Sequence, residues 1–207
     1  WLTCISLMLP FALFGGANFD FLSYGLLSEL PDENPSVQGA EKVQEHFPAG
    51  ETAPVTALLV DRGVDFSDEN TGMEAVRALT GRLEQRQEEL GISDIRSVSN
   101  PLGLNGLTYE GIVRDAADKI VNERGLSRWA AMGVARKNVR EKVMYYVSDQ
   151  GQLAGHVTRI DFVLQNDPFS RESMDQFDRL RAALAEEVER SDAFTRDGES
   201  RYQLHYV

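Results

Sequence analysis

The sequence predicts an α+β fold in which two βαβ units share one sheet and a long helical insertion separates them. Three observations support this: strand–helix–strand patterns at about 54–100 and about 155–207, and a helical stretch at about 102–153 between them. Two βαβ units in one sheet form the split βαβ, or ferredoxin-like, arrangement. Right-handed crossovers then place both connecting helices on the same face of a four-stranded sheet.

The first unit begins with the apolar run "VTALLV" at 55–60, whose length and branched side chains favour a buried strand. A helix is expected next, because Thr71 and Glu74 have the spacing of a capping box. Its apolar stripe consists of Met73, Val76, Leu79, Leu83 and Leu90. Gly91 is expected to end this helix in the left-handed conformation. The stretch "ISDIRSVS" at 92–99 then predicts the second strand.

The insertion contains two predicted helices, "LTYEGIVRDAADKIVNERG" and a second one capped by Ser127. We expect the following residues of the second helix to lie near one face: Trp129, Met132, Val139, Val143 and Tyr146.

After the insertion, "HVTRIDFVL" at 156–164 alternates in polarity and predicts a strand, with Arg159 and Asp161 on its polar side. Ser170 is expected to cap the last helix, and "RYQLHYV" predicts the last strand.

The first 19 residues contain no Asp, Glu, Lys or Arg, whereas an acidic stretch follows directly. We interpret residues 1–22 as the C-terminal end of a transmembrane helix with its exit segment, and residues 23–207 as an extracytoplasmic domain. The apolar run is shorter than the roughly 20 residues that cross a bilayer. Pro10 and Gly15-Gly16 are better tolerated in membrane helices than in soluble ones. A signal sequence without its basic region and a buried core helix are the alternatives.

Composition and motifs exclude several classes of function. The formal net charge of −12 argues against nucleic-acid binding, which needs a surplus of Lys and Arg. Cys4 is the only cysteine, so neither an intrachain disulfide nor a thiolate metal cluster can form. The sequence contains no phosphate-binding glycine motif, no nucleophile elbow and no pair of histidines at metal-ligand spacing. We therefore expect no enzymatic activity, no cofactor and no metal site.

Two segments resemble a known family. "LLSELPDENPSVQGAEKVQEHFPAGETAPVTALLV" at 26–60 resembles the start of the extracytoplasmic loop in bacterial MMPL-type transporters of the RND superfamily. The family's features fall here at Glu29-Leu30-Pro31, Pro35-Ser36, Gly39, His46 to Glu51, and Pro54. "TRIDFVLQNDPFSRESMDQFDRLRAAL" at 158–184 is similar to the family's strand, turn and amphipathic helix. The helical insertion is only loosely similar.

The resemblance implies a porter domain on the outer side of the bacterial cytoplasmic membrane, in a transporter that exports lipids or other hydrophobic molecules and is driven by protons. The implied partners are the transmembrane bundle and the second porter domain of the same chain, the hydrophobic substrate and the membrane, and a homo-oligomer is compatible with it. A membrane-tethered ferredoxin-like binding or sensor module is the alternative. Within the insertion, we expect Trp129, Met132, Tyr145 and Tyr146 to contact substrate, with ordinary helix packing as the alternative for each.

Overall fold

The centre of the protein is a four-stranded antiparallel sheet. The computed structural model describes residues 1–17, 30–31, 33–47, 49–103, 107–167, 170–196, 199–200 and 202–207. The sheet consists of β1 (Val55–Asp61), β2 (Ile92–Arg96), β3 (Val157–Leu164) and β6 (Tyr202–Tyr206), in the order β2-β3-β1-β6. The two-residue strands β4 (Thr195–Arg196) and β5 (Glu199–Ser200) pair with each other. The mixed α+β class predicted from the sequence is confirmed.

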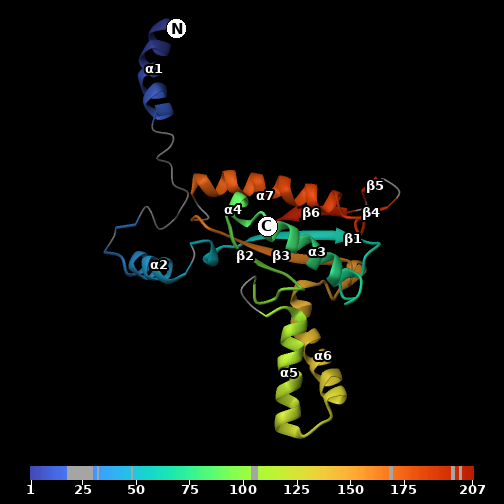
Figure 1. Cartoon of the computed structure of the whole chain (residues 1–207). Helices are drawn as coiled ribbons and strands as arrows, with labels where there is room; N and C mark the ends of the chain where they lie inside the picture. Colours follow the sequence, from blue (N-terminus) through green and yellow to red (C-terminus); the bar gives the residue numbers. More distant parts are fainter. Residues whose placement is uncertain are drawn as a thin grey trace.

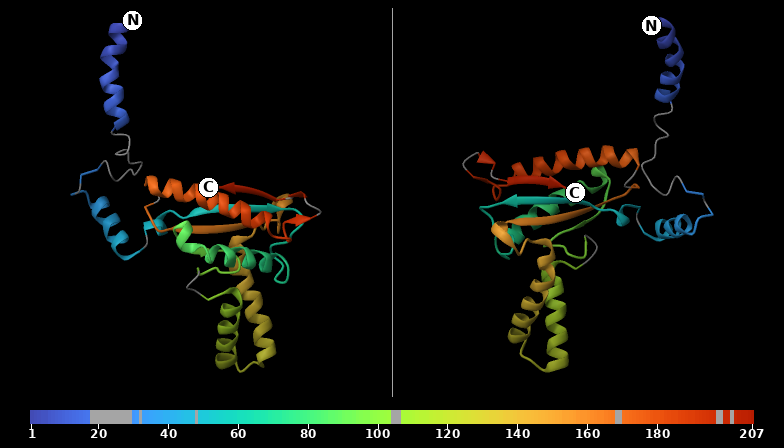
Figure 2. Two further views of the ribbon diagram at one scale, coloured as in Figure 1. Left: turned by 45° about the horizontal axis from the view of Figure 1, so that its top comes forward. Right: turned by 180° about the vertical axis from the view of Figure 1, so that it is seen from behind.

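Two long helices cover one face of this sheet. The helices α3 (Gly72–Glu84) and α4 (Gln87–Leu90) connect β1 to β2, and α7 (Arg171–Glu189) follows β3. Figures 1 and 2 show α3 and α7 on the same side of the strands. The core between helices and sheet includes the fully buried side chains of Leu59, Leu79, Leu83, Ile160, Phe162, Leu180 and Leu184. The burial of these large apolar side chains is the main favourable contribution to folding of this domain.

A helical hairpin projects from the body between β2 and β3 (Figure 1). It is formed by α5 (Tyr109–Arg124) and α6 (Arg128–Val143), and the one-turn helices η4 (Met144–Tyr146) and η5 (Gly151–Leu153) lead from it to β3. The N-terminal caps of α5 and α6 are hydroxyl groups. The Thr108 hydroxyl accepts from the N–H of Gly111, and the Ser127 hydroxyl accepts from the N–H of Ala130. The Ser127 cap was predicted from the sequence.

The predicted capping box of α3 is wrong. The side chain of Thr71 makes no capping hydrogen bond, and Glu74 pairs with Arg77 at 3.0 Å. Asp68 Oδ1 instead accepts hydrogen bonds from the N–H groups of Asn70 and Thr71 and from the Thr71 hydroxyl. A carboxylate is a stronger acceptor than a hydroxyl, so Asp68 accepts the hydrogen bonds of the turn that begins the helix. The hydrogen bond from the Thr71 hydroxyl, followed by those from the backbone N–H groups, lowers the pKa of Asp68.

Two element ends also differ from the prediction. The helix expected to run to Leu90 breaks after Glu84 and resumes as α4, which Gly91 ends with a φ of 64° as predicted. The second strand ends at Arg96 rather than at residue 99, because the N–H of Ser97 donates to the carbonyl of Asn100 across a tight turn. Backbone groups used in this turn are not available to a neighbouring strand.

The N-terminal region contains α1 (Leu2–Ala17), the helix α2 (Pro35–His46) and the short helix η3 (Ala49–Thr52). The described side chains of α1 are exposed on all sides, and none is charged. With 16 residues, α1 is too short to cross a bilayer, and no other helix in the described ranges has the length and hydropathy to do so. The α2 helix begins after Asn34, whose side chain accepts from the N–H of Ser36 at 3.0 Å. The predicted division between residues 22 and 23 lies outside the described residues.

A buried carboxylate connects α3 to α7. Glu187 is 2% exposed, and its Oε2 lies 2.8 Å from Nε of Arg82 on α3. Arg82 also donates to the backbone carbonyl of Glu187 at 3.1 Å. The other carboxylate oxygen lies 3.0 Å from Arg190 and 3.7 Å from Arg86. One acidic side chain therefore neutralises part of the charge of three arginines at the contact between the two covering helices.

Replacement of Glu187 by Ala is expected to lower the free energy of unfolding by about 1.5 to 3 kcal/mol, because three partly exposed arginines lose a charged acceptor and α7 loses its hydrogen bond to Arg82. Glu186 is the matched control, since its side chain is 51% exposed while it pairs with two of the same arginines. Glu186→Ala is expected to cost less than about 1 kcal/mol. Urea unfolding followed by circular dichroism measures both. Equal losses in the two variants would contradict the assignment.

Stability is also expected to fall at alkaline pH through Tyr206 on β6. Burial raises the pKa of Tyr206 to about 12 from its ordinary value of about 10. Between about pH 10 and 12 the folded state therefore retains the phenolic proton that the unfolded chain has lost. The contribution of the protonated Tyr206 to the free energy of unfolding is complete below about pH 10 and disappears as the pH rises towards 12. Tyr206→Phe keeps the edge-to-face ring contact with Phe177 and should reduce the slope of unfolding free energy against pH in this window. An unchanged slope would contradict the prediction.

Candidate functional site

Two consecutive tyrosines mark the point where the hairpin meets the sheet. Tyr145 and Tyr146 lie in η4, directly after α6. Their rings meet edge to face, with centroids 5.2 Å apart. Tyr146 is 8% exposed, whereas Tyr145 is 64% exposed. One ring is thus packed into the body, and the other projects into solvent beside it.

Tyr146 fixes the base of the hairpin. Its hydroxyl donates to the carbonyl of Pro101 at 3.2 Å. This hydrogen bond joins the segment that follows α6 to the segment that precedes α5. Its backbone carbonyl accepts from the Thr158 hydroxyl on β3 at 3.2 Å. Burial, together with the nearby carboxylate of Asp161, raises the pKa of the Tyr146 hydroxyl. The hydroxyl therefore stays protonated and remains a donor at neutral pH.

Tyr145 contacts a line of polar groups on the face of the sheet opposite α3 and α7. Arg159 donates from Nη1 to the Tyr145 hydroxyl at 2.6 Å, and its guanidinium carbon lies 4.9 Å from the centroid of the ring. The Arg159 Nε lies 2.7 and 3.0 Å from the two oxygens of Asp161. Asp161 in turn accepts from the Thr56 hydroxyl on β1 at 2.7 Å. Hydrogen bonding to Asp161 raises the pKa of Arg159, so this cation is permanent.

A groove runs along the hairpin on one side of the two tyrosines. Its volume is about 550 Å³, and it lies between α5 and α6. Apart from Tyr145 and Tyr146, its apolar lining consists of Pro101, Leu102, Ile112, Ala116, Ile120, Val139 and Val143. We call this depression the hairpin groove. Its size falls in the range of small-molecule sites.

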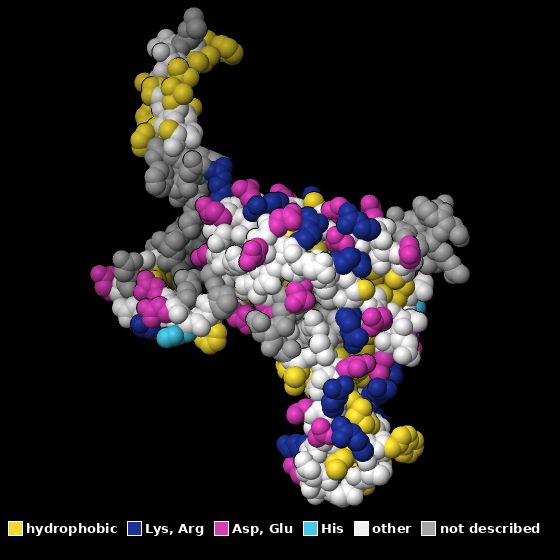
Figure 3. Space-filling view, viewed as in Figure 1, with side chains coloured by type: hydrophobic (Ala, Val, Ile, Leu, Met, Phe, Trp, Pro, Cys, Tyr) yellow, Lys and Arg dark blue, Asp and Glu magenta, His cyan; other side chains and the backbone are white. Residues whose placement is uncertain are grey.

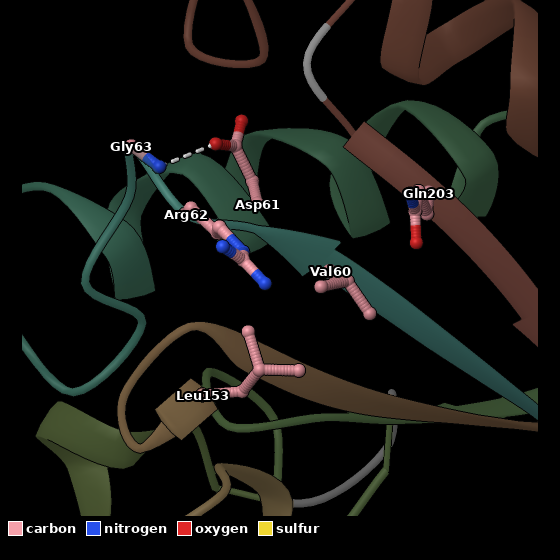
Figure 4. Close-up of a pocket in the computed structure, with 6 residues that line it drawn as sticks. All are labelled: Val60, Asp61, Arg62, Gly63, Leu153 and Gln203. Carbon is pink, nitrogen blue, oxygen red and sulfur yellow. Dashed lines mark hydrogen bonds between the residues drawn. The ribbon is translucent and has the colours of Figure 1, made fainter.

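Two further depressions lie on the sheet. The first has a volume of about 190 Å³ and is lined by Leu58, Val157, Arg159 and the same two tyrosines. The second, of about 530 Å³, includes Val60, two residues further along the same face of β1. Figure 4 shows Val60 and Arg62 directed to one side of β1, towards Leu153, and the Asp61 carboxylate directed to the other, where it accepts from the N–H of Gly63. Tyr145 and Tyr146 thus form a common wall between the hairpin groove and the exposed sheet face.

The structure brings together two of the four predicted contact residues and separates the other two. Trp129 and Met132 line a different depression near the far end of α6, together with Val134 and Arg136. Sixteen residues separate Trp129 from Tyr145, which corresponds to about 24 Å along a helix. That these four residues contact substrate stays a prediction, and the structure places them in two separate depressions.

The expected buried face of α6 also needs correction at Trp129, which is 88% exposed. The buried residues of this helix are Ala131, Ala135, Val139 and Val143. Alanines form the contact with α5 because small side chains let two helices approach closely. On this helix, small side chains rather than large ones mark the buried face. The pairing of Arg159 with Tyr145 was not predicted, although the alternation in "HVTRIDFVL" puts Arg159 on the polar side of its strand.

Comparison with known proteins relates the chain to an exporter. No family model matches it. The chain is 24% identical over 108 residues to a protein of Bacillus anthracis described as "Apo-petrobactin exporter". The match covers 51% of this chain and 14% of the exporter. The matched region is therefore a small part of a much longer protein.

Because the Tyr146 hydroxyl is packed into the body and the Tyr145 hydroxyl is exposed, we expect their removal to lower the free energy of unfolding by different amounts. Tyr146→Phe is expected to lower the free energy of unfolding by about 1 kcal/mol, because the partly buried carbonyl of Pro101 loses its donor. Tyr145→Phe is expected to cost less than about 0.5 kcal/mol, since its hydroxyl and ring are exposed. Urea unfolding of the two single variants and of the double variant measures these values. A larger loss for Tyr145→Phe would contradict the roles assigned here.

Proposed function

We propose that this chain is the extracytoplasmic porter domain of a membrane exporter of lipids or other hydrophobic molecules. The observation that carries the proposal is the pair of depressions that share Tyr145 and Tyr146 as a wall. Together they offer a surface that continues from the hairpin onto the sheet and is largely apolar, with Arg159 as a charged group on the sheet side. Similarity to an exporter over half of the chain supports the same function.

The fold supports the porter-domain part of the proposal. The first and third strands pair at the centre of the sheet, with the second and the last strand at its edges. The two connecting helices lie on one face, as a ferredoxin-like, split βαβ arrangement requires. The opposite face carries half-exposed side chains, including those of Thr56, Leu58 and Val60. In this proposal, the second porter domain of the same transporter lies opposite that face, across the passage that the cargo uses.

The N-terminal helix supports attachment to the membrane. A helix that is apolar on every side is stable only in apolar surroundings, and the described side chains of α1 have none within the domain. We place α1 in the lipid as the end of a transmembrane helix, with the acidic body in water outside the cytoplasmic membrane. The transmembrane bundle of the transporter would supply the coupling to protons.

Cargo movement would use the surface around Tyr145. The exposed ring lies between the apolar hairpin groove and the aliphatic side chains of Leu58 and Val157. A hydrophobic molecule that moves from one depression to the other passes this ring. Rigid-body rocking of the porter domain would open and close the passage, which is a common mode of alternating access in transporters built from repeats.

The proposal predicts that removal of the Tyr145 ring impairs export without loss of the protein. In the source organism, a strain lacking the gene is complemented with the native gene, with Tyr145→Ala or with Glu186→Ala as a surface control. Mass spectrometry of cell extracts and medium is expected to show a hydrophobic compound that the deletion strain retains, and that the native gene and the control release. Tyr145→Ala should reduce release at least about fivefold at equal abundance in the membrane, because the cargo loses about 1 kcal/mol or more of binding free energy from its contact with the ring.

Three outcomes would overturn the proposal: no compound shifts between cells and medium on deletion, the compound that shifts is strongly hydrophilic, or Tyr145→Ala supports native release at native abundance. Immunoblots of membrane fractions establish the abundance. They separate a defect in export from a defect in folding.

A further inference from the structure

The helical hairpin differs in charge from the rest of the chain. Segment 107–143 carries eight Lys or Arg and five Asp or Glu, so its formal charge is +3 in a chain whose net charge is −12. Figure 3 shows dark-blue basic side chains and yellow hydrophobic ones next to each other along the hairpin. An anion near this protein is therefore repelled by most of the surface and attracted to the hairpin.

The cations lie along the edge of the hairpin groove. Lys119, Arg124 and Lys142 line it, together with Glu123, its one acidic lining residue among those described. Glu123 lies 4.0 Å from Lys119 and so compensates that lysine. Within the described part of the chain, Arg124 and Lys142 have no carboxylate in ion-pair distance. Among the described residues, these two positive charges at the edge of the groove have no acidic partner.

The floor of the hairpin groove is apolar. Val139 and Val143 are 6% and 4% exposed, and Ile112, Ala116 and Ile120 are half-buried beside them. From Ile112 to Arg124 the groove follows α5 for 12 residues, or about 18 Å. A long, narrow apolar floor fits an extended alkyl chain, and a rim with unpaired cations fits an anionic head group.

We propose that the hairpin groove binds a single-chain amphiphile with an anionic head group, of the class of long-chain fatty acids. The alkyl chain lies on the floor formed by the isoleucines and valines, and the carboxylate pairs with Lys142 or Arg124. This inference rests on the proposed function, for which it names the class of cargo. An uncharged lipid would fill the floor without the attraction between a carboxylate and these exposed cations, so the carboxylate is the part that distinguishes the acid from its ester.

Photolabelling tests the site without requiring transport. The full chain is placed in phosphatidylcholine nanodiscs, which accommodate α1, and is irradiated with a palmitic acid analogue that carries a diazirine near the end of its chain. Peptide mapping is expected to find adducts in segments 112–124 and 138–146. Excess palmitic acid should remove these adducts, whereas its uncharged methyl ester should not. Adducts on α1, which contacts the lipid, provide a reference for the amount of probe in the bilayer.

Charge reversals then test the rim. Lys142→Glu and Arg124→Glu together are expected to reduce hairpin labelling relative to α1 labelling by about tenfold, because a charge-assisted hydrogen bond is replaced by repulsion. Lys137→Glu is the matched control for either rim reversal made alone: it makes the same change of charge as each of them on the exposed surface of α6 outside the groove lining, and it should change labelling less than about twofold. All three positions are exposed, and circular dichroism verifies that the variants keep the native helix content.

The proposal is overturned if adducts occur only on α1, if the methyl ester competes as well as the acid, or if Lys137→Glu reduces labelling as much as the rim variants. A protein that exports a hydrophobic compound but shows no hairpin labelling would contradict this inference alone. Hairpin labelling in a protein without export activity would contradict the proposed function and leave the binding site in place.

Discussion

The register between β1 and β3 determines which surface of this protein is core and which is open. Ala57 pairs with Ile160, and both are fully buried beneath the covering helices. The neighbouring pair, Leu58 with Arg159, therefore points to the opposite face. A slip by one residue would exchange the two faces and place an arginine in the core. The contact of Arg159 with Tyr145, and with it the position of the candidate site, depends on this register.

The hairpin is held at its base by polar contacts to two parts of the body. Tyr146 joins it to Pro101 and to β3, as described above. On the other side, Glu69 accepts from the Tyr109 hydroxyl at 2.7 Å and lies 3.5 Å from Arg136. Burial, followed by these interactions with Glu69, raises the pKa of Tyr109. The site thus lies where an independently packed helical pair and the sheet meet, and neither part alone forms it.

The sequence was informative at most of the positions where a few neighbouring residues decide the local structure. Ser127 and Ser170 cap their helices, and Gly91 ends α4, because capping and left-handed glycine depend on a few neighbouring atoms. The fold class followed from the alternation of such elements. Asp68 overrode the expected capping box because a nearby carboxylate is not part of that motif. The tyrosine wall could not be predicted in full, since Tyr145 meets an arginine that lies 14 residues away on a different element.

The two ends of the hairpin lie side by side, since the Tyr146 hydroxyl contacts Pro101. An arm attached at one end behaves as a lever. With α6 about 24 Å long, a rotation of about 10° at the attachment moves its tip by about 4 Å while the attachment itself stays in place. Trp129 lies near the moving end and Tyr146 at the pivot. Any force on the exposed indole is therefore transmitted, with a long moment arm, to the contacts around the two tyrosines.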